Sequence, residues 1–179
     1  GKDTEQSKKL WSKRPFEELY DIQNDPKELQ NIANKDSIQK IKKRLSERLI
    51  QWSLETRDSG FLTESDMHRR ANENGITPYE VLQNPKLYPI KKIIAAANMA
   101  SNPNTNQPDL LKLYDDQDPA VRYWAVQSQI INGFKNSSAK ELFLNALKDE
   151  NPTVKATAAE GLAKMGLAQT AIPVFKQLL

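Results

Sequence analysis

The sequence contains no cysteine, which excludes disulfide bonds, thiolate nucleophiles and cysteine-ligated zinc. It contains one histidine, His68, so a Ser/His/Asp triad would have to use that residue. His68 lies between Met67 and Arg69 in a polar stretch with helical spacing, which is typical of a surface histidine rather than a catalytic one. We therefore expect no catalytic residue in this chain.

Glycine and long apolar runs are also scarce. The six glycines are scattered near expected helix ends, so no glycine-rich phosphate loop is present. No run of 18 apolar residues occurs, and we expect no membrane span. The first five residues are polar and do not form a signal peptide. We interpret them as sequence from the middle of a longer protein, whose targeting segment would lie upstream.

An excess of one charge is missing as well. The chain has 26 Lys and Arg residues against 23 Asp and Glu residues, which gives a net charge of +3. The basic clusters Lys42-Lys43-Arg44 and Lys91-Lys92 stand beside apolar residues on expected helices and are interpreted as solvated helix faces. No basic stripe is interleaved with aromatic residues, so nucleic acid is not an expected partner.

The first part of the chain predicts one long helix. A short helix is expected from Thr4 to Trp11, and residues 16–22 should form a strand or an extended segment that ends at the turn 24–26. A capping box of Asp36 and Gln39 should open the long helix, which should end near Arg57. Its apolar residues form one stripe, in which the last member is expected to be core: Ile38, Ile41, Leu45, Leu49 and Trp52.

Short helices should follow. Thr63 and Asp66 begin one that closes at Gly75, and Thr77-Pro78 begins another that ends at Asn84-Pro85. A third should run from Pro89 to Ala100, before a polar loop over residues 101–107.

From Pro108 onward the sequence repeats with a period of 33 residues. Each copy predicts a helix, an Asp-x-Asp/Asn-Pro turn and a second helix, with the residue before proline as its cap. The aligned pairs are Leu111 and Leu144, Asp116 and Asp149, Asp118 and Asn151, Val121 and Val154, Arg122 and Lys155, Ala125 and Ala158, and Gly133 and Gly166. This pattern, over residues 108–166, resembles HEAT repeats, and residues 171–179 would be the first helix of a third unit.

A second resemblance covers the front. Residues 17–33, which read Glu17-Glu18-Leu19-Tyr20-Asp21-Ile22-x-Asn24-Asp25-Pro26-x-Glu28-x-x-Asn31-Ile32-Ala33, are similar to the closing segment of sulfatases. The stretches Glu55 to Leu62 and Thr77-Pro78-Tyr79-Glu80 resemble a bacterial, heparan N-sulfatase-like subgroup that continues into HEAT repeats. In that family the Glu-Leu-Tyr-Asp segment adds to a small sheet.

The resemblance carries over no catalytic residue. A sulfatase needs a formylglycine made within a Cys/Ser-x-Pro-x-Arg motif, together with a calcium site. The nearest segment, Ser101-Asn102-Pro103-Asn104-Thr105, lacks the arginine. The acidic group Asp115, Asp116 and Asp118 lacks the loop, glycine and distal glutamate of an EF-hand, and its recurrence in the next repeat favours turn and capping roles. We expect no cofactor in this chain; the parent sulfatase would use formylglycine and calcium.

Three adjacent residues, Arg122, Tyr123 and Trp124, are the candidate interaction surface. Packing within the helix stack is the preferred interpretation of Trp124, and Trp11 is a candidate anchor for an absent catalytic domain.

Together these patterns predict an all-α chain: a right-handed α-solenoid of HEAT-like helix pairs, preceded by a long helix and one short strand or extended segment. The expected domains are residues 1–62, the end of a sulfatase C-terminal subdomain; 63–107, connecting helices; and 108–179, repeats. The expected function is a non-catalytic accessory region of a sulfatase-like hydrolase, and the alternative is a free-standing HEAT interaction module. Its partner would be the catalytic domain or another protein, with sulfated glycan as a further candidate. The resemblance also implies a periplasmic or secreted location.

Overall fold

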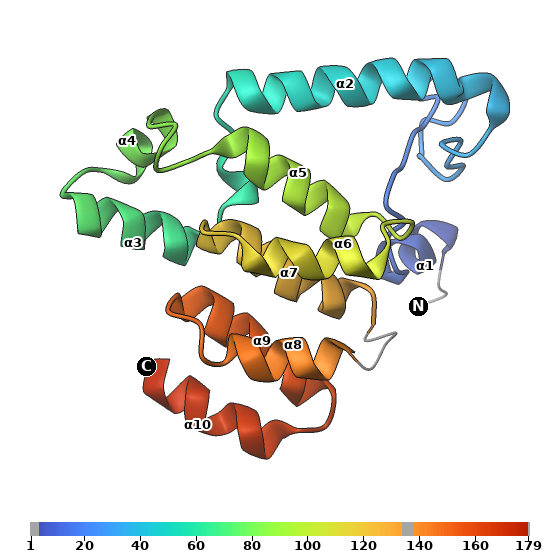
Figure 1. Ribbon diagram of the computed structural model, residues 1–179. Coiled ribbons are helices and arrows are strands. Elements are labelled where there is room, and N and C mark those ends of the chain that lie inside the picture. The colour runs from blue at the N-terminus through green and yellow to red at the C-terminus, as the bar shows by residue number, and fades with distance from the viewer. Residues whose placement is uncertain (1–3, 134–137, 179) are drawn as a thin grey trace. The chain divides into compact units, whose positions relative to one another are not determined.

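The computed structural model describes residues 4–133 and 138–178, and within these ranges the regular elements are all helices. The chain divides into two compact units, residues 1–55 and 56–179 (Figure 1). This division places residues 63–107 in one unit with the repeats. The three domains expected from the sequence, residues 1–62, 63–107 and 108–179, stay a prediction. Among the described helices, none has the length and apolar character that crossing a membrane requires.

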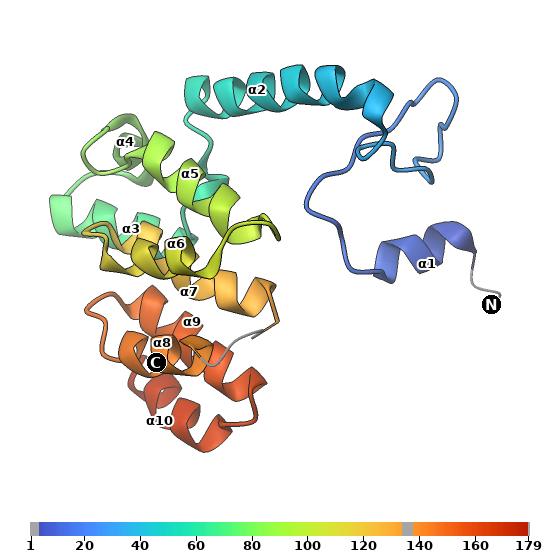
Figure 2. The same cartoon turned by 45° about the vertical axis from the view of Figure 1, so that its right-hand side comes forward.

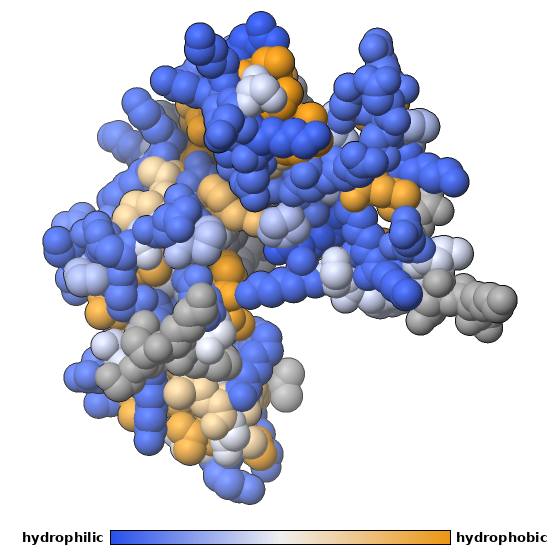
Figure 3. All heavy atoms as spheres, turned by 90° about the vertical axis from the view of Figure 1, so that its right-hand side faces the viewer, coloured by the Kyte–Doolittle hydropathy of each residue, from blue (hydrophilic) through white to orange (hydrophobic). Residues whose placement is uncertain are grey.

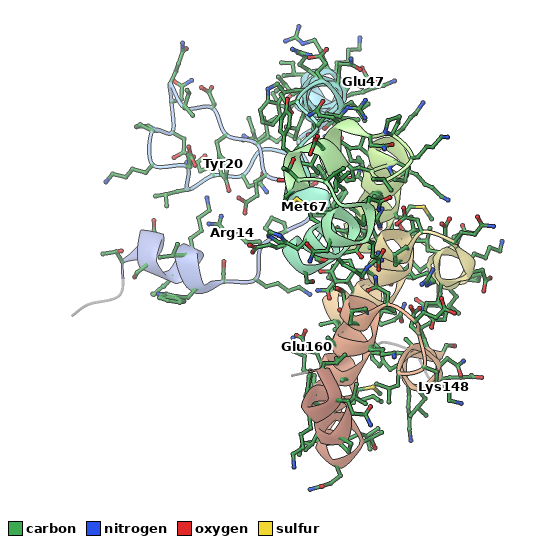
Figure 4. All side chains as sticks on the ribbon, turned by 90° about the vertical axis from the view of Figure 1, so that its left-hand side faces the viewer. Arg14, Tyr20, Glu47, Met67, Lys148 and Glu160 are labelled. Carbon is green, nitrogen blue, oxygen red and sulfur yellow. The ribbon has the colours of Figure 1, made fainter. Side chains whose placement is uncertain are left out.

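Residues 4–55 of the N-terminal unit contain two α-helices. α1 spans Glu5–Trp11, and the Thr4 hydroxyl caps it by accepting from the Ser7 amide at 3.1 Å. An irregular stretch follows, in which Arg14 and Tyr20 lie (Figure 4). After the 3-10 turn Asp36–Ile38, helix α2 spans Gln39–Glu55. The short helix and the long helix of the sequence analysis are therefore both present.

The strand that the sequence allowed at residues 16–22 is not seen in the described part of this unit. Strand pairing requires a ladder of backbone hydrogen bonds with a neighbour. Here one backbone bond, from the Ile32 amide to the Leu19 carbonyl at 2.9 Å, links the two arms of the segment. The Asn31 side chain forms two further hydrogen bonds between these arms: its amide donates to the Glu17 carbonyl, and its oxygen accepts from the Leu19 amide. The residues are extended but do not form a sheet.

The capping box expected at Asp36 and Gln39 was wrong. The chain enters α2 through a 3-10 turn whose N-cap, Lys35, forms no side-chain cap bond. The Gln39 amide instead donates to the carbonyls of Ala33 and Lys35, both at 2.9 Å. A glutamine can act as donor or acceptor, and here it donates, so it secures the preceding loop. At the other end α2 stops at Glu55, two residues before Arg57, which takes a positive φ of 55°.

The C-terminal unit begins with short helices whose caps match the sequence. After the 3-10 turn Ser59–Phe61, α3 spans Glu64–Asn74, α4 spans Pro78–Gln83 and α5 spans Ile90–Ser101. The Thr63 hydroxyl accepts from the Asp66 amide, and Gly75 closes α3 with a φ of 63°. Thr77 and Glu80 form a reciprocal capping box on α4. Side-chain caps thus fix the starts of α3 and α4 as the sequence predicts, whereas α5 begins after Pro89 without a side-chain cap bond.

The remaining helices form the repeated pairs. They are α6, Gln107–Lys112, with the 3-10 turn Leu113–Asp115; α7, Pro119–Ile131; α8, Ser138–Ala146; α9, Pro152–Lys164; and α10, Ala168–Leu178. Helices α5, α7 and α9 pack in succession, and α8 and α10 both pack on α9 (Figures 1 and 2). The repeated helix pairs are therefore present, and a right-handed solenoid stays a prediction.

The core of the repeats is small and tightly filled. The two aligned alanines, Ala125 and Ala158, are fully buried, as close approach of neighbouring helices requires. Phe143 of α8 is also fully buried and lies against Gly161 of α9. Phe143 and Ala158 belong to one buried apolar cluster, whose other members are Val126, Ala139, Leu142, Ala146, Val154 and Leu162.

Candidate functional site

The repeat turns have the same hydrogen-bond geometry in both copies. In the first, the Asp116 carboxylate accepts from the Asp118 amide at 2.8 Å, and in the second Asp149 accepts from the Asn151 amide at 2.8 Å. Asp118 and Asn151 then cap α7 and α9 by accepting from the amides of Ala120 and Thr153. The interpretation of these acidic residues as turn and cap residues agrees with these contacts. The oxygen atoms of these aspartates accept hydrogen bonds from backbone amides and form ion pairs with basic side chains.

Helix α3 binds the caps of both repeats. Arg70 donates to both carboxylate oxygens of Asp118, at 2.6 and 3.1 Å. Asp66, one turn earlier on α3, accepts from the Asn151 side-chain amide at 2.8 Å. The two α3 residues also pair with each other at 2.8 Å. The cap position of the first repeat is therefore an aspartate, Asp118, which faces the arginine of α3. The same position of the second repeat is an asparagine, Asn151, which faces the aspartate of α3.

We call this cluster, Asp66, Arg70, Asp118 and Asn151, the cap clamp. Its residues are largely buried: Asp66 is 2% exposed, Arg70 6% and Asn151 6%. Arg70 also donates to the carbonyl of Leu87, at the start of the segment that leads into α5. A buried charge is tolerated when it is paired and hydrogen-bonded. The cap clamp thus joins α3, the chain before α5, and the N-termini of α7 and α9.

The charges of the clamp shift the pKa values of Asp66 and Arg70. Burial by itself would raise the pKa of the Asp66 carboxyl, but the Arg70 and Arg69 charges and the Asn151 hydrogen bond hold that pKa below its ordinary value. Burial alone would lower the pKa of Arg70, and its bonds to Asp118 and Asp66 raise it instead. Both groups are therefore held in their charged forms.

A basic residue from the α-helix two before each turn pairs with the aspartate of that turn. Lys92 of α5 lies 2.7 Å from Asp116. Arg122 of α7 donates to both oxygens of Asp149, at 2.7 and 2.9 Å, and also to the carbonyls of Asp116 and Gln117. These pairs bind each turn to the α-helix two before it, α5 for the first turn and α7 for the second, so consecutive repeats share a fixed register.

The three residues of the predicted interaction surface, Arg122, Tyr123 and Trp124, form contacts mainly within the chain. Arg122 forms the pair with Asp149. The Trp124 indole donates to the Phe61 carbonyl at 3.0 Å, and its ring meets the Tyr123 ring edge to face, with centroids 5.2 Å apart. Burial and the nearby Glu160 charge raise the pKa of Tyr123; Glu160 lies on α9 (Figure 4). A recognition role for these three residues stays a prediction.

The structure gathers no catalytic cluster around the remaining candidates in its described residues. His68 lies on α3 with its ring 3.8 Å from Glu64, four residues earlier, and is exposed. Ser101 is the last residue of α5, and residues 102–105 form the loop after it. Across residues 4–133 and 138–178, no group of three or more histidine, aspartate or glutamate side chains is placed to hold a metal ion.

The apolar stripe of α2 is exposed, and the expectation that Trp52 belongs to a core was wrong. Trp52 is 49% exposed, Ile41 44%, Leu45 46% and Leu49 62%. The spacing correctly placed them on one helix face but could not show whether anything covers it. Trp11 of the same unit is 86% exposed.

A second apolar surface was missed by the sequence analysis. An open groove of about 510 Å³ lies at the start of α5, lined by Pro85, Tyr88, Pro89, Ile90 and Ala95 with Arg57, Lys91 and Lys92. Tyr88 forms its buried floor and donates to the Asp58 carbonyl at 2.5 Å. The signal in the sequence was the pair of prolines that flank a tyrosine, which we read only as helix punctuation.

Comparison with known proteins identifies the repeats. Residues 107–179 match the HEAT repeats family. An ulvan-active sulfatase from Formosa agariphila is 42% identical over 48 residues, a match that covers 27% of this chain and 10% of that enzyme. The match thus spans about a tenth of the length of this curated relative. No solved structure matches the chain. The HEAT-like repeats are confirmed, and the likeness to a sulfatase rests on one short segment.

Proposed function

We propose that this chain is a non-catalytic accessory region of a sulfatase-like hydrolase that acts on sulfated glycans. In this proposal residues 56–179 form a helical scaffold, and residues 1–55 attach it to the catalytic domain. The short match to an ulvan-active sulfatase and the HEAT match over residues 107–179 support the two halves of the proposal. The heparan N-sulfatase-like resemblance suggests a substrate class but not a particular glycan.

The single observation that carries the attachment is the exposed stripe of α2. Four large apolar side chains, Ile41, Leu45, Leu49 and Trp52, stand on one face at spacings of four, four and three residues, each between 44% and 62% exposed. A contiguous exposed apolar face typically marks a contact with another protein surface. Arg44, also exposed, flanks the stripe on one side, and Arg48 on the same side pairs with Glu55 at 3.0 Å. A matching surface would therefore carry apolar residues with an acidic residue near Arg44 at its edge.

The chemistry of the parent enzyme would lie outside this chain. Formylglycine formation needs a cysteine or serine followed by proline and arginine, and the segment after Ser101 does not fit it. The acidic residues of the repeat turns do not fit a calcium site, because their oxygens bind amides, Lys92, Arg70 and Arg122. The catalytic domain would supply both groups. By the same resemblance the whole protein would be periplasmic or secreted.

The alternative function is a free-standing HEAT module that binds a protein partner. The observation in its favour is the HEAT match itself, since helical repeats commonly present extended binding surfaces. The alternative gives no role to the sulfatase-like front segment. It predicts a specific partner that is unrelated to any sulfatase.

Binding in trans tests the proposal. The catalytic portion encoded upstream in the same reading frame would be produced separately and titrated with this chain by calorimetry. We expect a complex that the double variant Leu45→Asp, Leu49→Asp weakens at least about tenfold. Lys40→Asp, on the opposite side of α2, is the matched control and should bind like the original chain. Absence of binding by the unmodified chain would contradict the proposal, as would equal binding by the stripe variant.

A further inference from the structure

We propose that α10 and Lys155 form the docking surface for one more amphipathic helix of the α9 type, preceded by an acidic turn and in register with the 33-residue period. The proposal concerns the repeats alone and does not rest on the sulfatase assignment. It is supported by residue pairs that lie 33 positions apart in the repeats, and by the ion pair that Lys92 of the neighbouring helix α5 forms with the first turn.

The first line of evidence is the pairing of basic residues with turn aspartates. Lys92 on α5 pairs with Asp116, and Arg122 on α7 pairs with Asp149. Lys155 on α9 is the repeat equivalent of Arg122, but within residues 4–133 and 138–178 no carboxylate lies in ion-pair distance of it. Its side chain is half-buried beside the N-terminus of α9. The next aspartate in this series would come 33 residues after Asp149.

The second line of evidence is the apolar face of α10. Ala139 and Leu142 of α8 are 0% and 6% exposed, because α9 packs on that helix. Their equivalents on α10, 33 residues later, are Ile172 and Phe175, which are 43% and 38% exposed. Apolar residues also come to the surface at the end of the unit where α8 to α10 lie (Figure 3). The face that α9 covers in one repeat is thus uncovered in the next.

The occupant follows from α9 itself. Its turn offers Asp149 to Arg122, its cap is Asn151, and its inner face offers Val154, Ala158 and Leu162, all fully buried. A helix that repeats this pattern would present an aspartate to Lys155 and small apolar residues to Ile172 and Phe175. A helix of a repeat array buries its apolar face against its pair partner and the neighbouring repeats. A helix of the α9 type on α10 would therefore pair the Lys155 charge and cover the apolar face of α10 together.

A graft tests the inference. A copy of residues 147–166 is joined directly after Leu179, which places the copied aspartate one period after Asp149. Hydrogen exchange of the α10 amides is then followed by mass spectrometry. We expect exchange in α10 to slow about tenfold or more relative to the original chain, and Lys155→Ala to reverse part of this slowing. A graft in which the copied aspartate is alanine should not respond to Lys155→Ala.

A graft with the same residues in scrambled order is the matched control and should leave α10 exchange unchanged. Equal protection by the scrambled graft, or no protection by the ordered one, would overturn the inference. So would concentration-dependent dimerisation of the ungrafted chain that Phe175→Asp abolishes, because a second copy would then be the occupant.

Discussion

The guanidinium group of Arg70 forms an ion pair with the carboxylate of Asp118, 48 residues later, at 2.6 Å. Asp118 uses the same side chain to cap α7. Because its repeat equivalent Asn151 caps α9 and binds Asp66, one helix outside the repeats recognises two successive caps by complementary chemistry. The cap clamp therefore ties the connecting helices to the HEAT-like repeats.

Replacing the central charge of the clamp should be costly. Arg70→Met leaves the carboxylates of Asp66 and Asp118 without their shared partner in a buried site, and we expect a loss of about 3 kcal/mol in the free energy of unfolding. Urea unfolding followed by circular dichroism measures it. Lys112→Met, which removes an exposed pair with Asp109, is the control and should cost about 0–1 kcal/mol. Equal effects of the two substitutions would show that the clamp contributes little.

The asparagine of the clamp should not tolerate a carboxylate. In Asn151→Asp the cap oxygen is retained, but a carboxylate oxygen replaces the amide that lies 2.8 Å from Asp66. Two adjacent carboxylates raise the pKa of the pair, so the variant should lose about 2 kcal/mol at pH 7 and recover part of it as acid protonates the pair. Urea midpoints at pH 7 and pH 5 test this. A variant as stable as the original at pH 7 would contradict it.

The ion pair between Arg122 and Asp149 should make stability depend on pH. Burial alone would raise the pKa of Asp149, but bonds from Arg122 and the Asn151 amide hold it below its ordinary value. A carboxyl with a lower pKa in the folded state stabilises fully above its unfolded pKa, about 4, and loses this contribution as the pH falls through the folded pKa. Asp149→Asn should therefore be less stable than the original at pH 7 and nearly equal near pH 2. The urea midpoints at both pH values measure this, and an equal deficit at both would refute the assignment.

Gly161 is required because of its neighbour. A Cβ at this position would overlap the ring of Phe143, which is fully buried. Alanine favours a helix over glycine by about 1 kcal/mol, but the overlap should outweigh this and leave Gly161→Ala destabilised by about 1–3 kcal/mol. Combining it with Phe143→Leu should remove most of the overlap, so the two effects should not add. Additive thermal denaturation data for the double variant would reject this packing account.

Helix-capping and turn residues made many helix boundaries predictable from the sequence. Thr63, Gly75 and Thr77-Pro78 act within one turn of their own helices, so their roles can be read from neighbouring residues. The 33-residue period identified the turns but not every buried position. The aligned Leu111 and Leu144 are half-buried and 40% exposed, whereas the adjacent Leu110 and Phe143 are the buried pair.

Contacts between distant segments were not predictable. The sequence contains Asp66 and Arg70 at a spacing that suggests only an exposed intrahelical pair, and nothing in it relates them to Asp118 or Asn151. The same holds for the apolar stripe of α2. The spacing of its residues predicts that they share one helix face, but it does not predict whether another part of the protein packs on that face. Trp52 was assigned to a core for that reason. Gln39 failed as a capping residue because its amide can donate as well as accept.

The most direct measurement of the central claim is sulfate release. The product of the complete reading frame that encodes this chain, and the 179-residue chain alone, would be incubated with sulfated polysaccharide, and free sulfate would be quantified by ion chromatography. We predict release by the complete product and none by the chain alone. Release by the isolated chain, or none by the complete product across sulfated glycans, would contradict the assignment to a sulfatase-like hydrolase.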